Sequence, residues 1–467
     1  MSKVYGEMSR AVKSTRTVRN IKKYIPSFYE RAQRRKVPGT QLVWNMLGTG
    51  AEILKAFDLV GEWPENYGTL CAAQQVAMGF CEEAEAEGYS NDLCSYVRNS
   101  FGYLRRCRDL EAVPPEAPLG GMGNPNFLLG SGLICEPRFK WFQAMGTHFL
   151  KVPVFNDDPV SPPYDADLEN PRIAEHYKAQ IRATLRAQVS FLEEQTGNKL
   201  DTGRFREIMK NSQEAIKYWY QVLELRKAIP SPMGSEDYFT AIIPFLYLAG
   251  EPEAVDFYKA LYEEIKDRVD RGIGVIPEEK YRFCWLGIPP WFNLGLFNYL
   301  QTLGAVVCVE STYYVGQPVE LDLTDPLEGW VERTWKTAKI KQKYGSEGNP
   351  DVCNPGVFNP GVGGELIKHW VFEYQLDGAI GHRTRSCRAT SMGQLHVKKK
   401  LAEMGLPLLI FESDMVDPRA WSDAQIKRQF QDFLEIVETQ KKNKSEIRST
   451  NSGTNTKARN INFPKKV

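Results

Sequence analysis

The sequence predicts an α/β fold with two similar parallel-sheet domains joined by a helical bridge. Short apolar segments that resemble strands alternate with helical patterns, as in α/β proteins. This alternation occurs once in each half of the 467-residue chain, and a purely helical stretch separates the two halves. A chain of this length also exceeds what one hydrophobic core usually serves, so two domains are expected.

The expected strands are short runs of apolar and β-branched residues that are bounded by glycine or proline. They are 39–46, 126–135 and 148–155 in the first half, and 281–288, 304–312, 378–387 and 406–414 in the second. Helical patterns follow these runs, which is typical of parallel strands buried between helices.

Apolar residues at helical spacing, among them Ile181 and Leu185, predict the helical bridge. The expected organisation is an N-terminal helical or flexible arm (1–38), a first α/β domain (39–164), the bridge (165–230), a second α/β domain (231–440) and a basic tail (441–467). The tail is polar with few apolar anchors, so we expect it to be disordered or to order against a partner.

Composition excludes several classes of function. The net charge of +1 gives no argument for binding nucleic acid or an acidic membrane surface. No apolar run reaches the length of a membrane span, and the first twenty residues lack the apolar centre of a signal peptide. We therefore expect a cytoplasmic protein. The nine cysteines are odd in number and form no C-x-x-C motif, which argues against a disulfide framework and zinc fingers.

Three of the cysteines share the same surroundings. Cys135 and Cys387 each end a predicted strand and precede a helical pattern, and Cys94 follows two residues that favour helix starts. A helix N-terminus stabilises a thiolate, so we expect low thiol pKa values here. Thiolates are the usual ligands of iron–sulfur clusters. Against this, a buried cysteine is most often a small hydrophobic residue, and we assign that role to the other six, at 71, 81, 107, 284, 308 and 353.

Several stretches together resemble one protein family. They include "LVWNMLGTGAEILKAFDL", "WPENYG", "EAEGYSNDLCSYVRNSFGY", "GSGLICEPRFKWF", "EKYRFCWLGIPPW", "DGAIGHRTRSCRATSMGQ" and "LPLLIFESDMVDPRA", and they span roughly residues 39 to 440. The sequence resembles the 2-hydroxyacyl-CoA dehydratase and benzoyl-CoA reductase family. Within it, the resemblance is strongest to the B-type, cluster-bearing subunit of ATP-dependent benzoyl-CoA reductase.

The resemblance implies a [4Fe–4S] cluster in the cleft between the two domains. Its ligands would be Cys94, Cys135 and Cys387, the same three cysteines that share local surroundings. Three protein ligands leave one iron open, as in catalytic metal sites. In this family, water, a small sulfur ligand or the thioester oxygen of the substrate fills that position.

Charged residues crowd around Cys387. Arg383, Arg385 and Arg388 could donate hydrogen bonds to the cluster and balance its charge, or bind the phosphates of coenzyme A. Each could also be an ordinary solvated arginine. His382 is a candidate for delivering protons to the substrate, with a hydrogen-bonded supporting role as the favoured alternative.

The turn after the first strand distinguishes the two branches of the family. In dehydratases this turn is typically rich in serine, whereas here Trp44 and Asn45 lead into Met, Leu and Gly. The missing hydroxyl groups favour an apolar pocket that accepts a ring, and Trp44 and Asn45 are candidates for binding it. Glu52, after this turn, is a candidate for proton transfer or substrate positioning if burial raises its pKa, or else an ordinary helix-start carboxylate.

The leading hypothesis is therefore a [4Fe–4S] subunit of an aromatic acyl-CoA reductase that yields a cyclohexadiene-carbonyl-CoA. Alternatives are a subunit of a radical (R)-2-hydroxyacyl-CoA dehydratase and an electron-relay subunit that binds no substrate. The chain has no Walker A motif. The resemblance thus implies separate ATPase subunits with a bridging cluster, ferredoxin as electron donor, and a second cluster-bearing subunit of the same family.

Overall fold

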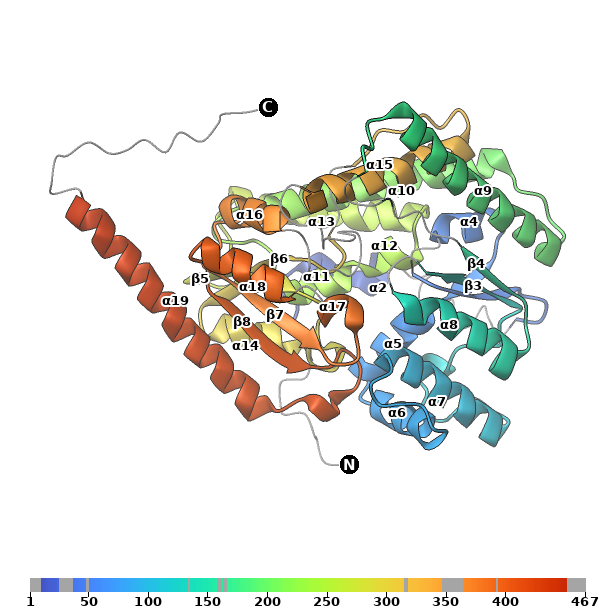
Figure 1. Ribbon diagram of the computed structural model, residues 1–467, viewed down its shortest axis with the longest axis horizontal. Coiled ribbons are helices and arrows are strands. Elements are labelled where there is room, and N and C mark those ends of the chain that lie inside the picture. Colours follow the sequence, from blue (N-terminus) through green and yellow to red (C-terminus); the bar gives the residue numbers. More distant parts are fainter. Residues whose placement is uncertain are drawn as a thin grey trace.

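Two four-stranded parallel sheets form the framework of the protein (Figure 1). The computed structural model of the chain describes residues 10–24, 37–47, 50–132, 135–157, 162, 166–314, 318–346, 364–391 and 394–451. We call each sheet, together with the helices next to it in sequence, a lobe. The predicted α/β class with two similar parallel-sheet domains is confirmed.

The first lobe holds the strand order β2-β1-β3-β4. Its elements are β1 (Leu42–Asn45), α4 (Ala51–Ala56), β2 (Val60–Glu62), α5 (Pro64–Ala73), α6 (Ala77–Ala86), α7 (Ser95–Leu110), η1 (Pro118–Gly120), β3 (Phe127–Ser131), α8 (Glu136–Ala144), η2 (Met145–Leu150) and β4 (Val154–Asp157). Strands β1 and β3 lie at the centre and are buried along their whole length, which explains their continuous apolar character.

The second lobe repeats this topology, with the strand order β6-β5-β7-β8. Its elements are β5 (Tyr281–Leu286), η3 (Trp291–Asn293), α14 (Gly295–Thr302), β6 (Ala305–Glu310), α16 (Gly364–Glu373), β7 (Gly378–Thr384), α17 (Arg388–Ser391), α18 (Gln394–Glu403), β8 (Leu408–Ser413), η4 (Pro418–Ala420) and α19 (Asp423–Asn451). In both sheets the first strand in sequence pairs with the second and the third, so β3 and β7 occupy equivalent places.

Long helices form a layer that we call the helical bridge. Helices α9 (Pro171–Thr196) and α10 (Thr202–Leu225) lie in the range 165–230 predicted for a bridge. The layer also contains four helices from the range predicted as the second domain: α11 (Ser235–Ala241), α12 (Ile243–Tyr247), α13 (Pro252–Asp270) and α15 (Pro326–Ser346). Helix α10 packs against α4 of the first lobe and against α13, and α15 packs against α9. Figure 1 shows these long helices lying together along one side of the molecule. No helix within the described ranges is both long and apolar enough to cross a membrane.

The N-terminal arm is attached to this helical layer. It contains α1 (Arg16–Arg19) and α2 (Ile21–Tyr24) within the described range 10–24. The backbone and side chain of Ser14 donate to Asp237 Oδ2 at 2.9 and 2.5 Å. The Thr17 N–H donates to Glu264 Oε2 at 2.7 Å. Carboxylates thus satisfy N–H groups that the start of α1 leaves free.

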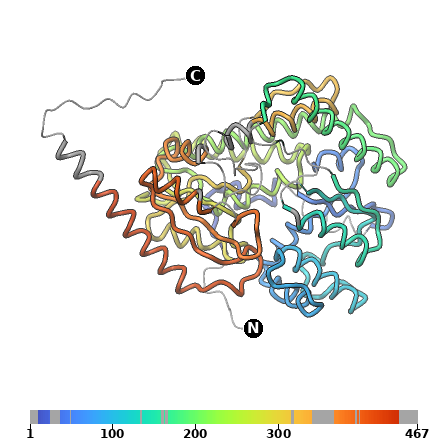
Figure 2. Tube along the Cα trace, viewed as in Figure 1, coloured from blue at the N-terminus to red at the C-terminus, as the bar shows by residue number. Residues whose placement is uncertain are grey.

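Two expectations about elements were wrong. The segment 148–155 is mostly not a strand: η2 continues α8 to Leu150, and Lys151 adopts a left-handed conformation (φ 56°) before β4 begins at Val154. Helix α19, which runs along the outside of the second lobe (Figure 2), also ends only at Asn451, past the start of the expected basic tail at 441. Lys441 anchors it there, because its Nζ lies 2.9 Å from Asp377 Oδ1. Residues 452–467 lie outside the described residues.

A buried ion pair joins the helical bridge to the second sheet. Arg226, at the end of α10, donates from Nη1 and Nη2 to the two carboxylate oxygens of Glu310 at 2.6 and 2.7 Å. Their side chains are 1% and 0% exposed. Two nitrogens of the guanidinium face the two oxygens of the carboxylate, which is the bidentate geometry of this ion pair. Because water does not reach these groups, each charge is stabilised by the other.

We expect the Glu310→Ala substitution to lower the free energy of unfolding by about 3–5 kcal/mol, because Arg226 would be left buried without its partner. The matched control is Glu224→Ala, which removes a half-exposed ion pair to Lys227 and should cost about 0–1 kcal/mol. Thermal and urea unfolding of the two variants beside the parent protein measures the difference. Equal losses in the two variants would contradict the assignment.

Candidate functional site

Each of the three candidate cysteines lies at the start of a helix. Cys94 is the N-cap of α7 and Cys135 is the N-cap of α8. Cys387 directly precedes α17, and its carbonyl oxygen accepts the Ser391 N–H at 3.2 Å. The local placement predicted from the sequence is therefore confirmed for all three thiols.

Two of these cysteines occupy equivalent positions in the two sheets. Cys135 follows β3 and Cys387 follows β7, each the third strand of its sheet. These strands lie next to the first strand at the point where the strand order reverses, which is where open parallel sheets bind ligands. Figure 1 shows the carboxyl ends of β7 and β8 pointing toward the first lobe.

A buried hydrogen-bonded bridge ties Cys94 to Cys387. Ser95 Oγ and Ser386 Oγ each donate to one oxygen of Asp414 at 2.5 Å, and the Ser95 N–H donates to Ser386 Oγ at 3.1 Å. We call Ser95, Ser386 and Asp414 the Asp414 bridge. Because Ser95 follows Cys94 and Ser386 precedes Cys387, the bridge joins the chain next to one cysteine to the chain next to the other, across the two lobes.

An ion-pair network continues this interface. Arg98, one turn after Ser95, donates from Nη1 to Asp417 Oδ2 at 2.8 Å and to Glu85 Oε1 at 2.5 Å. Arg419 also binds both carboxylates. Arg98 is only 2% exposed, so the pairing is largely screened from water. The network fixes α7 of the first lobe against the segment after β8 of the second.

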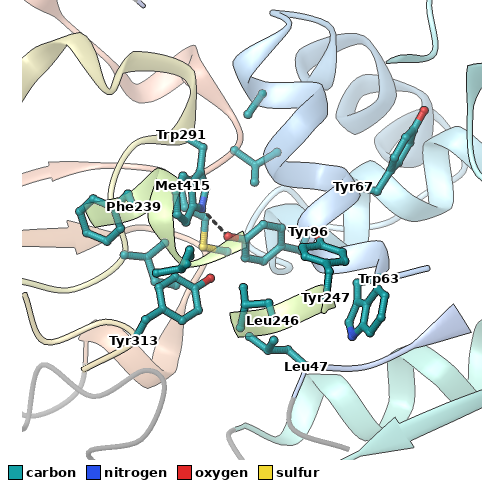
Figure 3. Packing of buried hydrophobic residues seen from close by; sticks show 14 of the residues in the cluster. Leu47, Trp63, Tyr67, Tyr96, Phe239, Leu246, Tyr247, Trp291, Tyr313 and Met415 are labelled. Carbon is teal, nitrogen blue, oxygen red and sulfur yellow. Dashed lines mark hydrogen bonds between the residues drawn. The ribbon is translucent and has the colours of Figure 1, made fainter. Parts of the chain in front are cut away.

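Aromatic side chains pack the remainder of the lobe interface (Figure 3). Trp291 Nε1 donates to the Tyr96 hydroxyl at 2.6 Å. Between the first lobe and the helical bridge, Trp63 and Tyr247 of α12 meet edge to face with ring centroids 4.6 Å apart. All four residues are buried. Apolar packing and the polar contacts thus act together to fix the lobes around the cysteines.

Electrostatics shows that the three thiols influence one another. Burial raises the pKa of Cys94 well above its usual value, and the charges of Cys387 and Cys135 raise it further. Burial likewise raises the pKa of Cys135 to about 12, with Arg138 acting in the opposite direction and Cys387 in the same one. The pKa of Cys387 is raised mainly by burial. The three thiols therefore share one electrostatic environment, in which Cys387 is buried from solvent and Cys94 and Cys135 are half-buried.

The expected low thiol pKa values were therefore wrong for the protein without metal. Backbone N–H groups of Tyr96 and Val97 do lower the pKa of Cys94, but the loss of hydration outweighs them. A bound metal would reverse this balance, because a coordinating thiol loses its proton. The donor set fits a cationic iron–sulfur centre, for which protein thiolates at backbone N–H groups are the usual ligands.

In the described part of the chain, no three His, Cys, Asp or Glu side chains, Cys94, Cys135 and Cys387 included, are arranged to hold a single metal ion. Among the remaining cysteines, Cys71, Cys81, Cys284 and Cys308 are buried and Cys107 is half-buried, in agreement with packing roles. Cys353 lies outside the described residues.

Glu52 does not meet the condition for a proton donor. Burial raises its pKa, but the charge of Arg333 and the Ser212 hydroxyl outweigh burial, so the net pKa is lowered. Arg333 Nη1 and Ser212 Oγ lie 2.7 and 2.8 Å from Glu52 Oε1. Glu52 is thus an ionised carboxylate in the first turn of α4, held by α15 and α10. Its proposed part in positioning substrate stays a prediction.

His382 lies in the core of the second lobe. It is fully buried, its ring stacks on Phe411 with centroids 4.8 Å apart, and Nδ1 donates to the Ile288 carbonyl at 2.5 Å. Burial lowers its pKa to about 4, so the ring is neutral near neutral pH. These contacts favour the supporting role over proton delivery.

The candidates in the first strand are also buried. Trp44 and Asn45 are each 1% exposed, and Trp44 Nε1 donates to the Gly123 carbonyl at 2.9 Å. Trp44 is therefore a core residue in this conformation. The part of either residue in binding substrate stays a prediction.

The arginines near Cys387 in sequence point elsewhere. Arg383 donates from Nε to Glu412 Oε2 at 2.9 Å, and Arg385 Nε lies 3.4 Å from Glu412 Oε1. Both are about half exposed or more. Arg383 and Glu412 line a surface groove of about 360 Å³ between β8, α18 and α19. The positive charges of Arg383 and Arg385, which the sequence placed near Cys387, are thus paired with Glu412. Arg388 is exposed.

Sequence reasoning missed two groups of residues. The Asp414 bridge was one, although a serine adjoins Cys94 and another adjoins Cys387, which was a visible signal. The second is Glu65 with Arg138, whose side chains form a buried ion pair at 3.2 Å. Glu65 lies in the "WPENYG" stretch and Arg138 follows Cys135 by three residues, so both stood beside motifs already singled out.

The fold and the site define a two-lobed α/β protein with thiols from both lobes brought to one interface. Comparison with known families then places it: the model described as "2-hydroxyglutaryl-CoA dehydratase, D-component" matches residues 47–437. The chain belongs to this family of 2-hydroxyacyl-CoA dehydratase and benzoyl-CoA reductase subunits, and it is an enzyme subunit. The family typically carries an iron–sulfur cluster.

Curated relatives cover nearly the whole chain. It is 30% identical to the (R)-2-hydroxyisocaproyl-CoA dehydratase alpha subunit of Clostridioides difficile, over 90% of this chain and 96% of the relative. It is 29% identical to the B-type subunit of benzoyl-CoA reductase from Thauera aromatica, over 89% and 93%. The alpha subunit of lactoyl-CoA dehydratase from Anaerotignum propionicum is 25% identical over 87% and 93%. All three are named as subunits, which implies a multisubunit complex.

The pKa of His382 makes a testable contribution to stability. In the unfolded chain the imidazole pKa is about 6.5, and in the folded protein it is about 4. Protonation therefore favours unfolding, and stability is lost as the pH falls below about 6.5. Between pH 6.5 and pH 5, this group should lower the free energy of unfolding of the parent protein by about 2 kcal/mol. The His382→Gln variant should not show this part of the loss.

The matched control is His369→Gln, because His369 is 52% exposed and pairs with Glu373 on the surface. Urea unfolding at the two pH values measures the loss in each protein, and carboxylates common to all three cancel. An equally steep loss in His382→Gln and in the parent would refute the assignment.

Proposed function

We propose that this chain is the cluster-bearing subunit of an ATP-dependent reductase for benzoyl-CoA or a related aromatic acyl-CoA. The observation that carries the proposal is that Cys94, Cys135 and Cys387 come from two lobes, start three helices and act on one another electrostatically. Such a set of thiols is costly to ionise unless a cationic centre binds them.

Cys94, Cys135 and Cys387 would hold the [4Fe–4S] cluster. When bound, such a cluster supplies one-electron chemistry at low potential, and three protein ligands leave one iron free. The chain's own part is to keep water away, through the buried aromatic residues Tyr96 and Trp291, and to direct backbone N–H groups at the thiolates. The Asp414 bridge would keep the ligands of the two lobes together.

The turn after β1 favours a reductase over a dehydratase. Met46 and Leu47 are 0% and 5% exposed, and residues 44–48 offer no side-chain hydroxyl. A hydroxyacyl substrate needs a hydrogen-bonding partner for its hydroxyl group, whereas an aromatic ring is bound best by apolar walls. Identity does not separate the branches, since it is 30% to one dehydratase relative and 29% to one reductase relative.

A second candidate is a subunit of a radical (R)-2-hydroxyacyl-CoA dehydratase. The similarity to four proteins named as dehydratase alpha subunits favours it. An electron-relay subunit that binds no substrate is the third candidate. The three share the cysteine ligands and differ in what lies beside the open iron.

Coenzyme A would extend toward cationic side chains. Arg383, Arg385 and Arg388 are the candidates for its phosphates, with Lys398 beside Arg383 in the groove. A phosphate would have to compete with Glu412 for Arg383 and Arg385. Guanidinium groups suit phosphate geometry, so such an exchange of partners is chemically reasonable.

The partners follow from the chemistry. The electrons needed have a very low potential, and this chain carries no Walker A motif. We therefore propose separate ATPase subunits with a bridging cluster, ferredoxin as electron donor, and a second cluster-bearing subunit of the same family.

Anaerobic assay of the complex that co-purifies with the chain tests this function. With benzoyl-CoA, reductant and ATP, we expect a cyclohexadiene-carbonyl-CoA product and ATP hydrolysis. Dehydration of a 2-hydroxyacyl-CoA without ring reduction would overturn the proposal in favour of the second candidate. If the complex is active although this chain binds no acyl-CoA, the third candidate, an electron-relay subunit, would be favoured.

The ligand set has its own test. We expect Cys94→Ala, Cys135→Ala and Cys387→Ala each to lose most of the iron and acid-labile sulfide from roughly four of each per chain. The reason is that a cluster with two protein ligands is held weakly and is open to solvent. Metal analysis of anaerobically purified protein makes the measurement.

The matched control is Cys284→Ala, which removes a fully buried thiol from within β5. It should keep the iron and sulfide content of the parent. Full iron content in any of the three ligand variants would remove that cysteine from the proposed set.

A further inference from the structure

Arg138 is an unusual buried cation next to the candidate cluster site. It lies in the first turn of α8, three residues after Cys135, and its side chain is 3% exposed. Its Nη2 donates to the Leu47 carbonyl and to Glu65 Oε2, the latter at 3.2 Å. The Leu47 N–H also donates to Glu65 Oε2 at 3.2 Å. The ion pair therefore binds the turn that follows β1 through the backbone of Leu47.

Two nitrogens of this guanidinium are unused. Nε and Nη1 of Arg138 have no hydrogen-bond partner among the described residues, although both atoms are buried. A buried donor without a partner costs free energy, the more so when it carries charge. Such a donor in a folded protein points to a ligand that completes it.

The surroundings of Arg138 include residues of both lobes. The charge of Arg138 acts on Cys135 of the first lobe and on Tyr313 of the second. Tyr313 is 3% exposed, and its φ of 65° is a strained conformation of the kind that gathers at functional sites. Arg138 is thus within electrostatic reach of a proposed cluster ligand and of the opposite lobe.

The charge balance defines what kind of ligand fits. Glu65 already compensates the positive charge of Arg138, so a further full anion would leave a net negative charge in a site closed to water. A neutral acceptor with a strong dipole fits better. The carbonyl oxygen of an acyl thioester is such an acceptor, and a hydrogen bond from a charged donor strengthens as that oxygen gains negative charge.

We propose that Arg138 donates a hydrogen bond to the carbonyl oxygen of the acyl-CoA thioester and selects thioesters over analogues that lack this oxygen. The inference rests on the proposed function, because it assumes that this chain binds the acyl-CoA. Glu65 acts as the positioning residue that holds the guanidinium.

A pair of ligands that differ in one oxygen tests this role. The probes are benzoyl-CoA and S-benzyl-CoA, the thioether without the carbonyl group, and the protein is the full chain purified without oxygen with its co-purifying subunits. Isothermal titration gives the ratio of the two dissociation constants. We expect the parent protein to prefer benzoyl-CoA roughly 10- to 100-fold, as for a hydrogen bond to a charged group.

The Arg138→Met variant should lower this ratio by at least tenfold, while binding of S-benzyl-CoA changes little. Any preference that remains is expected from the open iron, which the thioester oxygen can also bind. Arg138→Lys keeps the charge beside Glu65 and protects the fold, and it should lower the ratio by about tenfold, because lysine lacks the guanidinium fork. The matched control is Arg271→Met, which removes an arginine that is 64% exposed and pairs with Asp267. It should leave the ratio unchanged.

The outcomes separate this inference from the function on which it rests. If the parent binds neither ligand, the proposed function fails and this inference fails with it. If the parent prefers the thioester and both Arg138 variants keep that preference, or if the parent binds the two ligands equally, only the role of Arg138 is overturned.

Discussion

The structure depends on one constraint: a buried aspartate holds two serines from opposite lobes. Ser95 and Ser386 donate to the two oxygens of Asp414, and each serine is the direct neighbour of a candidate cluster ligand. Asp414 is 3% exposed, so an unpaired carboxylate here would be costly. The lobes therefore meet in one register, and that register sets the positions of Cys94 and Cys387.

This constraint explains how the fold keeps three thiols that are costly to ionise at the lobe interface. These thiols have raised pKa values because water cannot stabilise their ionised forms. The Asp414 bridge and the aromatic interface keep the thiols together before any metal arrives. In the proposed cluster-bearing form, the free energy of metal binding would offset the cost of ionising them, and metal binding would be coupled to the stability of the lobe interface.

Much of this could be predicted from local sequence. The alternation of short apolar runs and helical patterns identified the class of fold and seven of the eight strands, although the run at 148–155 was placed too early. The three-residue strand β2 was missed because it is too short to show a pattern. The surroundings of Cys94, Cys135 and Cys387 correctly placed each at the start of a helix, because capping depends only on near neighbours in sequence.

What local sequence could not provide is the direction of side chains and their distant partners. Arg383 and Arg385 lie close to Cys387 in sequence, yet both side chains pair with Glu412. That carboxylate comes from the neighbouring strand β8. His382 and Glu52 seemed reactive until their partners, Phe411 and Arg333, became known. The sign of a pKa shift depends on burial, which is a property of the whole fold.

Iron anomalous scattering from crystals of the anaerobically purified protein can locate the cluster and its ligands. We expect one iron centre in contact with the sulfur atoms of Cys94, Cys135 and Cys387, with Ser95 and Ser386 both bound to Asp414. An iron centre held by cysteines of a single lobe, or lobes that have separated so that Asp414 faces solvent, would contradict this expectation.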